Sequence, residues 1–248
     1  MKKVALVVAF MVVAGSVIGC QQQAAPEKAA PAKAEKKVEK APAAAPATKP
    51  AQKAATAPAT AKAEAAKGDW KLAYTAQFAG KLDKAWSVFQ GDAEVKDGKL
   101  IVSSEVQDAT TILTAPVFTA ASIRVELTAY LEQAPQVSDL SILLNASKND
   151  PMDGYLFQFG GKGNTMLGLN KHDEIIKATV KDKPLVVPGK KYQIVAENDK
   201  GHLKLIIDGQ TVIDYVDPSP ISGKDNALIG FYTWESKLVI EKLAVYQK

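Results

Sequence analysis

The stretch LKLIIDGQTVI, at residues 203–213, consists of two apolar-rich runs joined by Asp208-Gly209. Asp-Gly between alternating runs predicts a β-hairpin, because both residues tolerate the positive φ angles of a two-residue turn. The same arrangement recurs where Asp97-Gly98 separates residues 93–96 from residues 99–102. These two stretches predict that antiparallel strands dominate the C-terminal part of the chain.

Alternation of apolar and polar residues extends through that part. It is clearest at residues 122–127 and returns at residues 138–145, 192–196 and 202–205. Turn residues separate about twelve strand candidates, and no stretch keeps helical periodicity for three turns. Residues 69–248 therefore predict an all-β fold, a two-sheet jelly-roll sandwich.

The N-terminus has the features of a secretory signal peptide. Met1-Lys2-Lys3 is basic, residues 4–13 are apolar, and small residues follow. The apolar run is shorter than the roughly 20 residues that span a bilayer. Residues 17–20, Val-Ile-Gly-Cys, resemble the lipobox of bacterial lipoproteins. This resemblance implies a signal peptide at 1–19 and lipidation of Cys20, the single cysteine; the alternative is an ordinary signal that happens to end at a cysteine.

Lipid chains on Cys20 would anchor the mature chain to a membrane. The next residue is Gln21 rather than Asp, which resembles lipoproteins sorted to the outer membrane. We therefore expect a cell-envelope protein, lipid-anchored in the outer membrane, with its domain on the periplasmic or the cell-surface side.

Residues 20–68 form an Ala/Pro/Lys-rich segment without aromatic residues. Such a segment buries too little apolar surface to offset its ordering entropy, which predicts a disordered tether. Its lysines could contact anionic cell-wall polymers or could only keep the spacer soluble.

The positive charge of the chain lies outside the predicted domain. Residues 21–68 hold nine lysines and four glutamates, and the leader holds two lysines. Because the whole chain has a net charge of +4, residues 69–248 have a net charge of −3. A slightly acidic domain argues against nucleic acid as a partner.

The order of turns and strands resembles the concanavalin A-like lectin/glucanase superfamily, near its laminin-G-like and putative 3-keto-disaccharide hydrolase branches. The resemblance covers residues 72–247. It rests on Trp86 with the Asp97-Gly98-Lys99-Leu100 turn, on Gly154–Gly160, on Gly201–Gly209, on Gly230-Phe231-Tyr232 and on residues 237–246. Members of this superfamily mostly bind or cut carbohydrates, and some bind proteins, so the resemblance alone does not select one function.

The sequence shows no pair of carboxylates suited to glycoside hydrolysis. Glu126 and Glu132 would share a strand face but lie about 20 Å apart. Residues 143–147, Leu-Leu-Asn-Ala-Ser, lack the glycine and the arginine that the hydrolase-like branch often carries there. We therefore nominate no catalytic residue and lean against an enzyme; if the chain is one, the resemblance implies a glycoside hydrolase.

No cofactor is predicted. Asp150 and Asp153, with Asn149, form a loop rich in the oxygens that calcium prefers, although the same residues are typical of turns. His172 and His202 lie thirty residues apart and lack the further ligands that zinc sites use.

A carbohydrate site would use aromatic rings for stacking and amide or charged groups for hydrogen bonds. We expect such side chains at strands or strand ends, with Tyr155 and Trp234 facing a groove, although most aromatic residues of a sandwich belong to its core. The candidates are Tyr155, Gln158, Asn164, Asn170, His172, Tyr232, Trp234 and Arg124. Arg124, the one arginine, could instead pair with a neighbour across its sheet.

The leading hypothesis is a membrane-anchored lipoprotein whose domain binds carbohydrate or cell-envelope glycan. The alternatives are a glycoside-hydrolase-like enzyme acting on modified disaccharides and a laminin-G-like protein-interaction module. Two facing carboxylates would favour the enzyme, and a large exposed apolar patch would favour the interaction module. The oligomeric state is not predicted.

Overall fold

The computed structural model describes residues 68–104, 108–132 and 137–248. By its contacts the chain divides into two units, Met1–Ala55 and Thr56–Lys248, and the described residues all belong to the second. The predictions for the signal peptide, Cys20 and the tether lie outside the described residues. Within the described ranges, no helix is long and apolar enough to cross a membrane.

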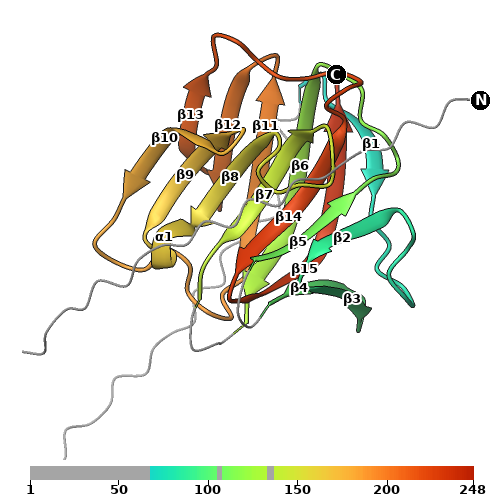
Figure 1. The fold of residues 1–248 in the computed structure, drawn as a ribbon, viewed down its shortest axis with the longest axis vertical. Helices are drawn as coiled ribbons and strands as arrows, with labels where there is room; N and C mark the ends of the chain where they lie inside the picture. The colour runs from blue at the N-terminus through green and yellow to red at the C-terminus, as the bar shows by residue number, and fades with distance from the viewer. Residues whose placement is uncertain (1–67, 105–107, 133–136) are drawn as a thin grey trace, which may run out of the picture. The chain divides into compact units, whose positions relative to one another are not determined.

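The domain consists of two antiparallel sheets packed face to face (Figure 1). Sheet A has the strand order β13-β12-β11-β6-β15-β4-β3, with β1 also paired to β15. Its strands are β1 (Lys71–Thr75), β3 (Asp92–Lys96), β4 (Lys99–Ser103), β6 (Ser122–Leu131), β11 (Tyr192–Asp199), β12 (His202–Ile207), β13 (Gln210–Val216) and β15 (Lys237–Gln247).

Sheet B has the order β10-β9-β8-β7-β14-β5-β2. Its strands are β2 (Trp86–Gln90), β5 (Asp108–Leu113), β7 (Leu140–Ala146), β8 (Tyr155–Gly160), β9 (Met166–Lys171), β10 (Glu174–Val180) and β14 (Leu228–Trp234). One short helical turn, α1 (Gly161–Asn164), connects β8 to β9. The predicted all-β two-sheet sandwich is confirmed.

Both predicted hairpins are present. Asp97-Gly98 joins β3 to β4, and Asp208-Gly209 joins β12 to β13. The two aspartates have φ angles of 50° and 49° and the two glycines 75° and 81°. Positive φ at both central residues is the requirement of a type I′ turn, whose twist matches that of the flanking strands.

The core fills the space between the sheets. Aromatic rings from β8 and β14 (Tyr155, Phe157 and Phe231) are fully buried there, facing apolar residues of sheet A such as Val125. Because side chains alternate along a strand, the residues between these core positions point away from the partner sheet. We call that side of each sheet its outer face.

Candidate functional site

One row of side chains crosses the outer face of sheet B. Tyr232 on β14 lies opposite Thr110 on β5 and opposite Ser141 on β7, and Ser141 lies opposite Gln158 on β8. The row ends at Gly168 on β9, which pairs with Gln158. Neighbouring strands lie about 4.8 Å apart, so the five positions of the row span about 19 Å, and two or three neighbours are within reach of one small ligand.

One side of this row is apolar and covered. Ile112, Leu143 and Leu156 form a second buried cluster with Tyr232, and Met152 packs against it. Met152 belongs to the loop between β7 and β8. The same loop is tied to the far edge of the sheet, because the Asn149 side-chain amide donates a 2.5 Å hydrogen bond to Ser87 Oγ on β2.

The other side of the row is open and acidic. Asp108, at the start of β5, accepts a 2.5 Å hydrogen bond from the Tyr232 hydroxyl. Trp234 lies directly opposite Asp108 in the register and is 40% exposed. A bulge at β2 sets Phe89, 43% exposed, beside Thr110. One exposed ring, Trp234, therefore lies beside a carboxylate, an arrangement that suits a ring-shaped polar ligand.

A second carboxylate lies beneath the row. Asp139, immediately before β7, has a positive φ of 59° and is 4% exposed. Its Oδ1 accepts hydrogen bonds from Ser141 Oγ at 3.3 Å and from Gln158 Nε2 at 3.1 Å, and its Oδ2 accepts one from Ser138 Oγ at 3.2 Å.

Burial is the main cause that raises the pKa of Asp139 to about 6; the three hydrogen bonds act in the opposite direction, and the negative charge of Asp108 adds a smaller upward effect. Burial and the hydrogen bond to Asp108 also raise the pKa of Tyr232, so this hydroxyl stays protonated and remains a donor. The face thus holds one buried carboxyl group, Asp139, whose pKa is raised towards neutrality.

Three buried oxygens of this face have no hydrogen-bond partner among the described residues. They are Thr110 Oγ1, Gln158 Oε1 and Asn170 Oδ1. Thr110 and Gln158 belong to the row, and Asn170 lies on β9 opposite Leu156. Buried polar groups are almost always bonded to protein or water, so a cluster of unmade bonds indicates where a ligand or ordered water completes the site.

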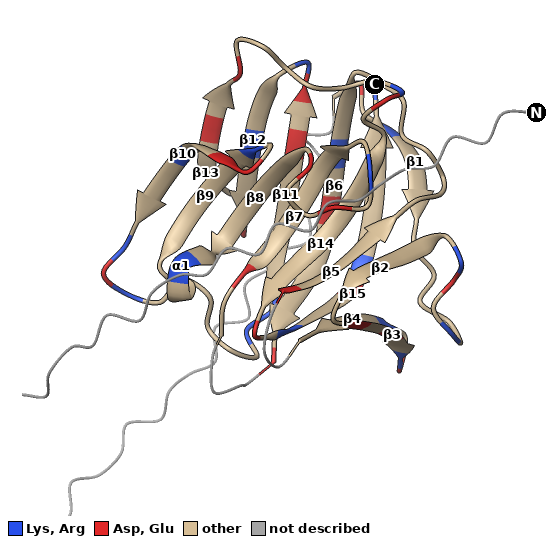
Figure 2. Ribbon diagram, viewed as in Figure 1, with Lys and Arg blue, Asp and Glu red and all other residues tan. Residues whose placement is uncertain are grey.

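The charge pattern separates the two sheets. The strands β7, β8 and β14 carry no charged residue, whereas in sheet A β6 carries both signs, β11 and β13 carry acidic residues and β12 carries a lysine (Figure 2). Asp108 and Asp139 are therefore the charged groups close to the row, and no lysine or arginine of these central strands offsets them. The site suits neutral or cationic ligands better than anionic ones.

Comparison with known proteins agrees with the fold. Residues 69–245 match the model of the 3-keto-alpha-glucoside-1,2-lyase-like domain family. The chain belongs to this family. No curated protein matches the chain by sequence. The branch of the concanavalin A-like superfamily that the turn motifs resemble is thereby confirmed.

Solved structures share the fold of this lyase-like domain at low identity. A carbohydrate-binding module, CBM66 from Bacillus subtilis, has a TM-score of 0.51 and 16% identity over 63% of this chain and 92% of its own. A laminarinase from Flavobacterium sp. UMI-01 has a TM-score of 0.50 and 16% identity over 71% and 100%. The exoplasmic/lumenal domain of VIP36 has a TM-score of 0.51 and 9% identity over 66% and 84%.

The structure places four of the candidates named from the sequence on the outer face of sheet B, namely Gln158, Asn170, Tyr232 and Trp234. The expectation that Tyr155 faces a groove is wrong. Its ring is fully buried between the sheets, where its hydroxyl donates a 2.5 Å hydrogen bond to Asp217 and accepts one from Ile221 N at 3.0 Å. Tyr155 is therefore a core residue that fixes the β13–β14 connection.

Arg124 lies on the other sheet of the lyase-like domain. Its guanidinium bonds Glu197, directly across on β11, and Glu126 at 2.7 Å on its own strand. The expected pairing with a neighbour across the sheet is confirmed. Arg124 is consequently too distant from the outer face of sheet B to act with Tyr232 and Trp234.

Asn164 and His172 also lie away from the row. The Asn164 side chain donates to Val186 O at 2.8 Å and accepts from Val186 N at 2.8 Å and Leu185 N at 3.2 Å, so it holds the segment that follows β10. His172 lies in the β9–β10 turn, half exposed, 3.5 Å from Asp153. Neither residue contacts Tyr232 or its neighbours in the row, so neither belongs to this candidate site.

The loop with Asp150 and Asp153, between β7 and β8, is held by hydrogen bonds and ion pairs from its own residues and from His172. Asp153 Oδ2 accepts from Ser147 N, Ser147 Oγ and Lys148 N at 2.6–3.0 Å, and its Oδ1 lies near His172. Asp150 accepts from Met152 N and pairs with Lys148. All four carboxylate oxygens thus have protein partners, as the turn interpretation requires. Across the described ranges, no group of three or more His, Cys, Asp or Glu side chains is placed to hold a metal.

Sequence reasoning missed Asp108, Thr110, Asp139 and Ser141. A local signal existed for Thr110 and Asp108, because alternation along β5 places both on the side opposite Ala109. Asp139 had no such signal, since its backbone leaves the extended region just before β7 begins.

Proposed function

We propose that this chain is a lipid-anchored envelope protein whose outer face of sheet B binds carbohydrate. The observation that carries the proposal is the half-exposed Trp234 beside the Asp108–Tyr232 hydrogen bond, with unpartnered oxygens of Thr110 and Gln158 in the same row. An exposed aromatic side chain with hydrogen-bond donors and acceptors close by suits a sugar ring, which has apolar C–H faces and hydroxyl groups around its edge. Membership of a family described by a glucoside-acting domain supports the same ligand class.

The test is a glycan-array screen of the full chain, with Trp234→Ala as the binding variant. Removing an exposed aromatic anchor should weaken binding by about 2 kcal/mol, roughly thirtyfold, while the unfolding free energy changes by less than about 0.5 kcal/mol. Tyr130→Ala on the outer face of sheet A removes a matched aromatic ring and should leave binding intact. Absence of any glycan hit would contradict the proposal.

Anchoring is the second part of the proposal and rests on residues 17–20 and the composition of residues 21–68. A lipid on Cys20 and a long polar spacer would hold the domain at a distance from the membrane and leave sheet B accessible. Expressed in a bacterium fed labelled palmitate, the full chain should incorporate label and sediment with membranes. Cys20→Ser should lose both properties; unchanged labelling would refute this part.

A second candidate function is catalysis on a disaccharide. It is favoured by Asp139, whose pKa is raised to about 6 by burial and by the charge of Asp108. A carboxyl group with a pKa raised towards neutrality is a common feature of sites that transfer protons. Asp108, at the surface of the row, is the carboxylate that can contact a substrate, and Asp139 beneath it is a positioning residue.

Incubating the full chain with 3-keto-α-glucosides, and measuring released sugar by chromatography, tests this candidate. Asp108→Asn should lower kcat by at least a hundredfold if the carboxylate transfers a proton. Ser141→Ala, which removes a donor to Asp139, should shift the pH profile of kcat. Binding without turnover would leave carbohydrate recognition as the function.

A further inference from the structure

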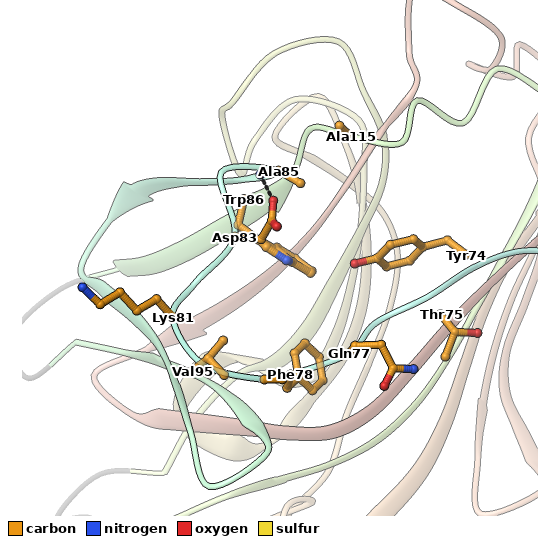
Figure 3. A pocket seen from close by; sticks show the side chains of 11 residues that line it. Tyr74, Thr75, Gln77, Phe78, Lys81, Asp83, Ala85, Trp86, Val95 and Ala115 are labelled. Carbon is orange, nitrogen blue, oxygen red and sulfur yellow. Dashed lines mark hydrogen bonds between the residues drawn. The ribbon is translucent and has the colours of Figure 1, made fainter.

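A separate cavity lies between the edges of the two sheets. It has a volume of about 310 Å³ and is enclosed by the end of β1, the segment that leads to β2, the start of β2 and Val95 on β3 (Figure 3). Ligand pockets begin at about 300 Å³, so this volume is sufficient for one small molecule. It opens on a different side of sheet B from the outer face, since the Trp86 ring that lines it points toward the core.

Three aromatic rings form its walls, namely Tyr74, Phe78 and Trp86. Trp86 is only 8% exposed, and its ring packs at 5.9 Å from that of Phe231 in the core. Tyr74 packs edge-on against Phe118 at 6.3 Å. These core contacts hold the rings in place, so the cavity is preformed rather than created by mobile side chains.

Polar groups converge on the same space without partners. Trp86 Nε1 and the Tyr74 hydroxyl make no hydrogen bond to any described residue, and Figure 3 shows the hydroxyl pointing toward the indole. Asp83 Oδ1 accepts a 2.8 Å hydrogen bond from Ala85 N, and its other oxygen has no partner in the described part of the chain. Burial, and then the nearby charge of Asp83, raise the pKa of Tyr74, so the hydroxyl remains a donor.

The charges select the class of ligand. The Trp86 Nε1 and the Tyr74 hydroxyl are hydrogen-bond donors that a quaternary ammonium ligand, which has no acceptor, could not use. The Asp83 carboxylate disfavours an anion, and the Lys81 ammonium extends away from the cavity (Figure 3). Two donors, one acceptor and an apolar ring beneath them match a neutral ring that carries hydroxyl groups.

We propose that this cavity is a second binding site, for a single neutral sugar ring, formed by Tyr74, Phe78, Asp83 and Trp86. Trp86 and Tyr74 donate to ring hydroxyl oxygens, Asp83 accepts from a ring hydroxyl, and Phe78 contacts the C–H face. The site is independent of the outer face of sheet B, because the two share no residue. A chain with both sites would bind a glycan and, separately, one terminal or free sugar.

The experiment titrates the full chain with D-glucose, D-galactose, D-mannose and N-acetyl-D-glucosamine, read by saturation-transfer NMR and tryptophan fluorescence. Tyr74→Phe keeps the ring and removes one donor; Trp86→Phe keeps an aromatic ring on Phe231 and removes the other. Each should weaken sugar binding roughly three- to tenfold, the value of one neutral hydrogen bond. Tyr130→Ala, on the outer face of sheet A, should leave this binding unchanged, whereas binding that only Trp234→Ala removes would belong to the outer face of sheet B.

Three results would overturn the proposal: no saturable binding of any of the four sugars, binding that both donor variants leave unchanged, or binding of choline in place of sugar. Loss that occurs only in Trp234→Ala would also overturn it, because the ligand would then occupy the outer face. Tyr74→Phe guards against misfolding as the explanation, since Tyr74 is only partly buried and its ring is retained. Urea unfolding of each variant confirms that the fold persists.

Discussion

The outer faces of the two sheets use their polar side chains differently. On sheet A, charged side chains bind one another: Arg124 bonds Glu197, and Lys99 and Lys191 both pair with Glu241 at 3.2 and 2.9 Å. On sheet B, the row from Thr110 to Gln158 contains few charges and leaves oxygens without partners.

This difference indicates which face recognises a ligand. Polar groups that already satisfy one another gain little from a new partner, because each new bond replaces an existing one. Polar groups held unpaired against an apolar sheet gain a full bond when a ligand arrives. The unpaired oxygens of sheet B are the reason why we propose this face, rather than the ion-paired face of sheet A, as the binding surface.

Breaking the ion pairs of sheet A should cost the most stability. Arg124→Ala leaves Glu197, whose side chain is only 11% exposed, without its cation, and should lower the unfolding free energy by about 3 kcal/mol. Urea denaturation measures the loss. A double variant, Arg124→Met with Glu197→Leu, should recover most of it, because no buried charge remains. Glycan binding on sheet B should not change, and a loss of binding here would refute the separation of the two faces.

The pH dependence of the unfolding free energy should report the ionisation of Asp139, the buried carboxyl group of sheet B. Because the folded-state pKa of Asp139 is raised from 3.8 to about 6, the folded protein binds this proton more tightly than the unfolded chain. The stabilisation of the folded state by this bound proton is therefore present in full below pH 4. It is lost as the pH rises to about 6, which lowers the unfolding free energy by up to about 3 kcal/mol.

Comparison with Asp139→Asn isolates this effect from the other carboxyls. Asp153, Asp199 and Asp217 have lowered pKa values, so their contributions change in the opposite direction and at lower pH. The difference in urea midpoint between wild type and Asp139→Asn should vary between pH 4 and pH 6 and level off above it. A pH-independent difference would show that Asp139 ionises normally.

The smallest effect is expected at Tyr232. Tyr232→Phe removes the hydrogen bond to Asp108 and should cost about 1 kcal/mol of stability, because water can reach the partly exposed carboxylate in its place. The same change should weaken glycan binding by roughly threefold. Calorimetric titration of the variant against wild type measures both the affinity and its enthalpy; unchanged affinity would remove Tyr232 from the site.

The sequence predicts the local elements well, and the reason is physical. The Asp97-Gly98 and Asp208-Gly209 hairpins depend on two residues and their immediate neighbours, so their geometry is contained in the stretch that encodes them. The exposure of Trp234 followed from alternation on β14, where Tyr232 and Trp234 share a face.

The site residues that were missed or misplaced from the sequence depend on strand pairings between distant segments of the chain. Asp108 and Asp139 meet because β14, more than eighty residues further along the chain, inserts between β5 and β7. No spacing within the sequence reports that order. Tyr155 was misplaced because β8 is apolar on both faces, with Leu156 buried outward and Phe157 inward, so alternation alone could not assign its direction.

The most direct test of the account is amide chemical-shift mapping of the full chain with the glycan that binds most tightly on the array. We expect shifts concentrated on β5, β7, β8 and β14, including the amides of Thr110, Ser141 and Trp234, and little change on β6, β11 and β15. Shifts concentrated on sheet A, with Trp234 unaffected, would contradict the claim that the outer face of sheet B is the binding surface.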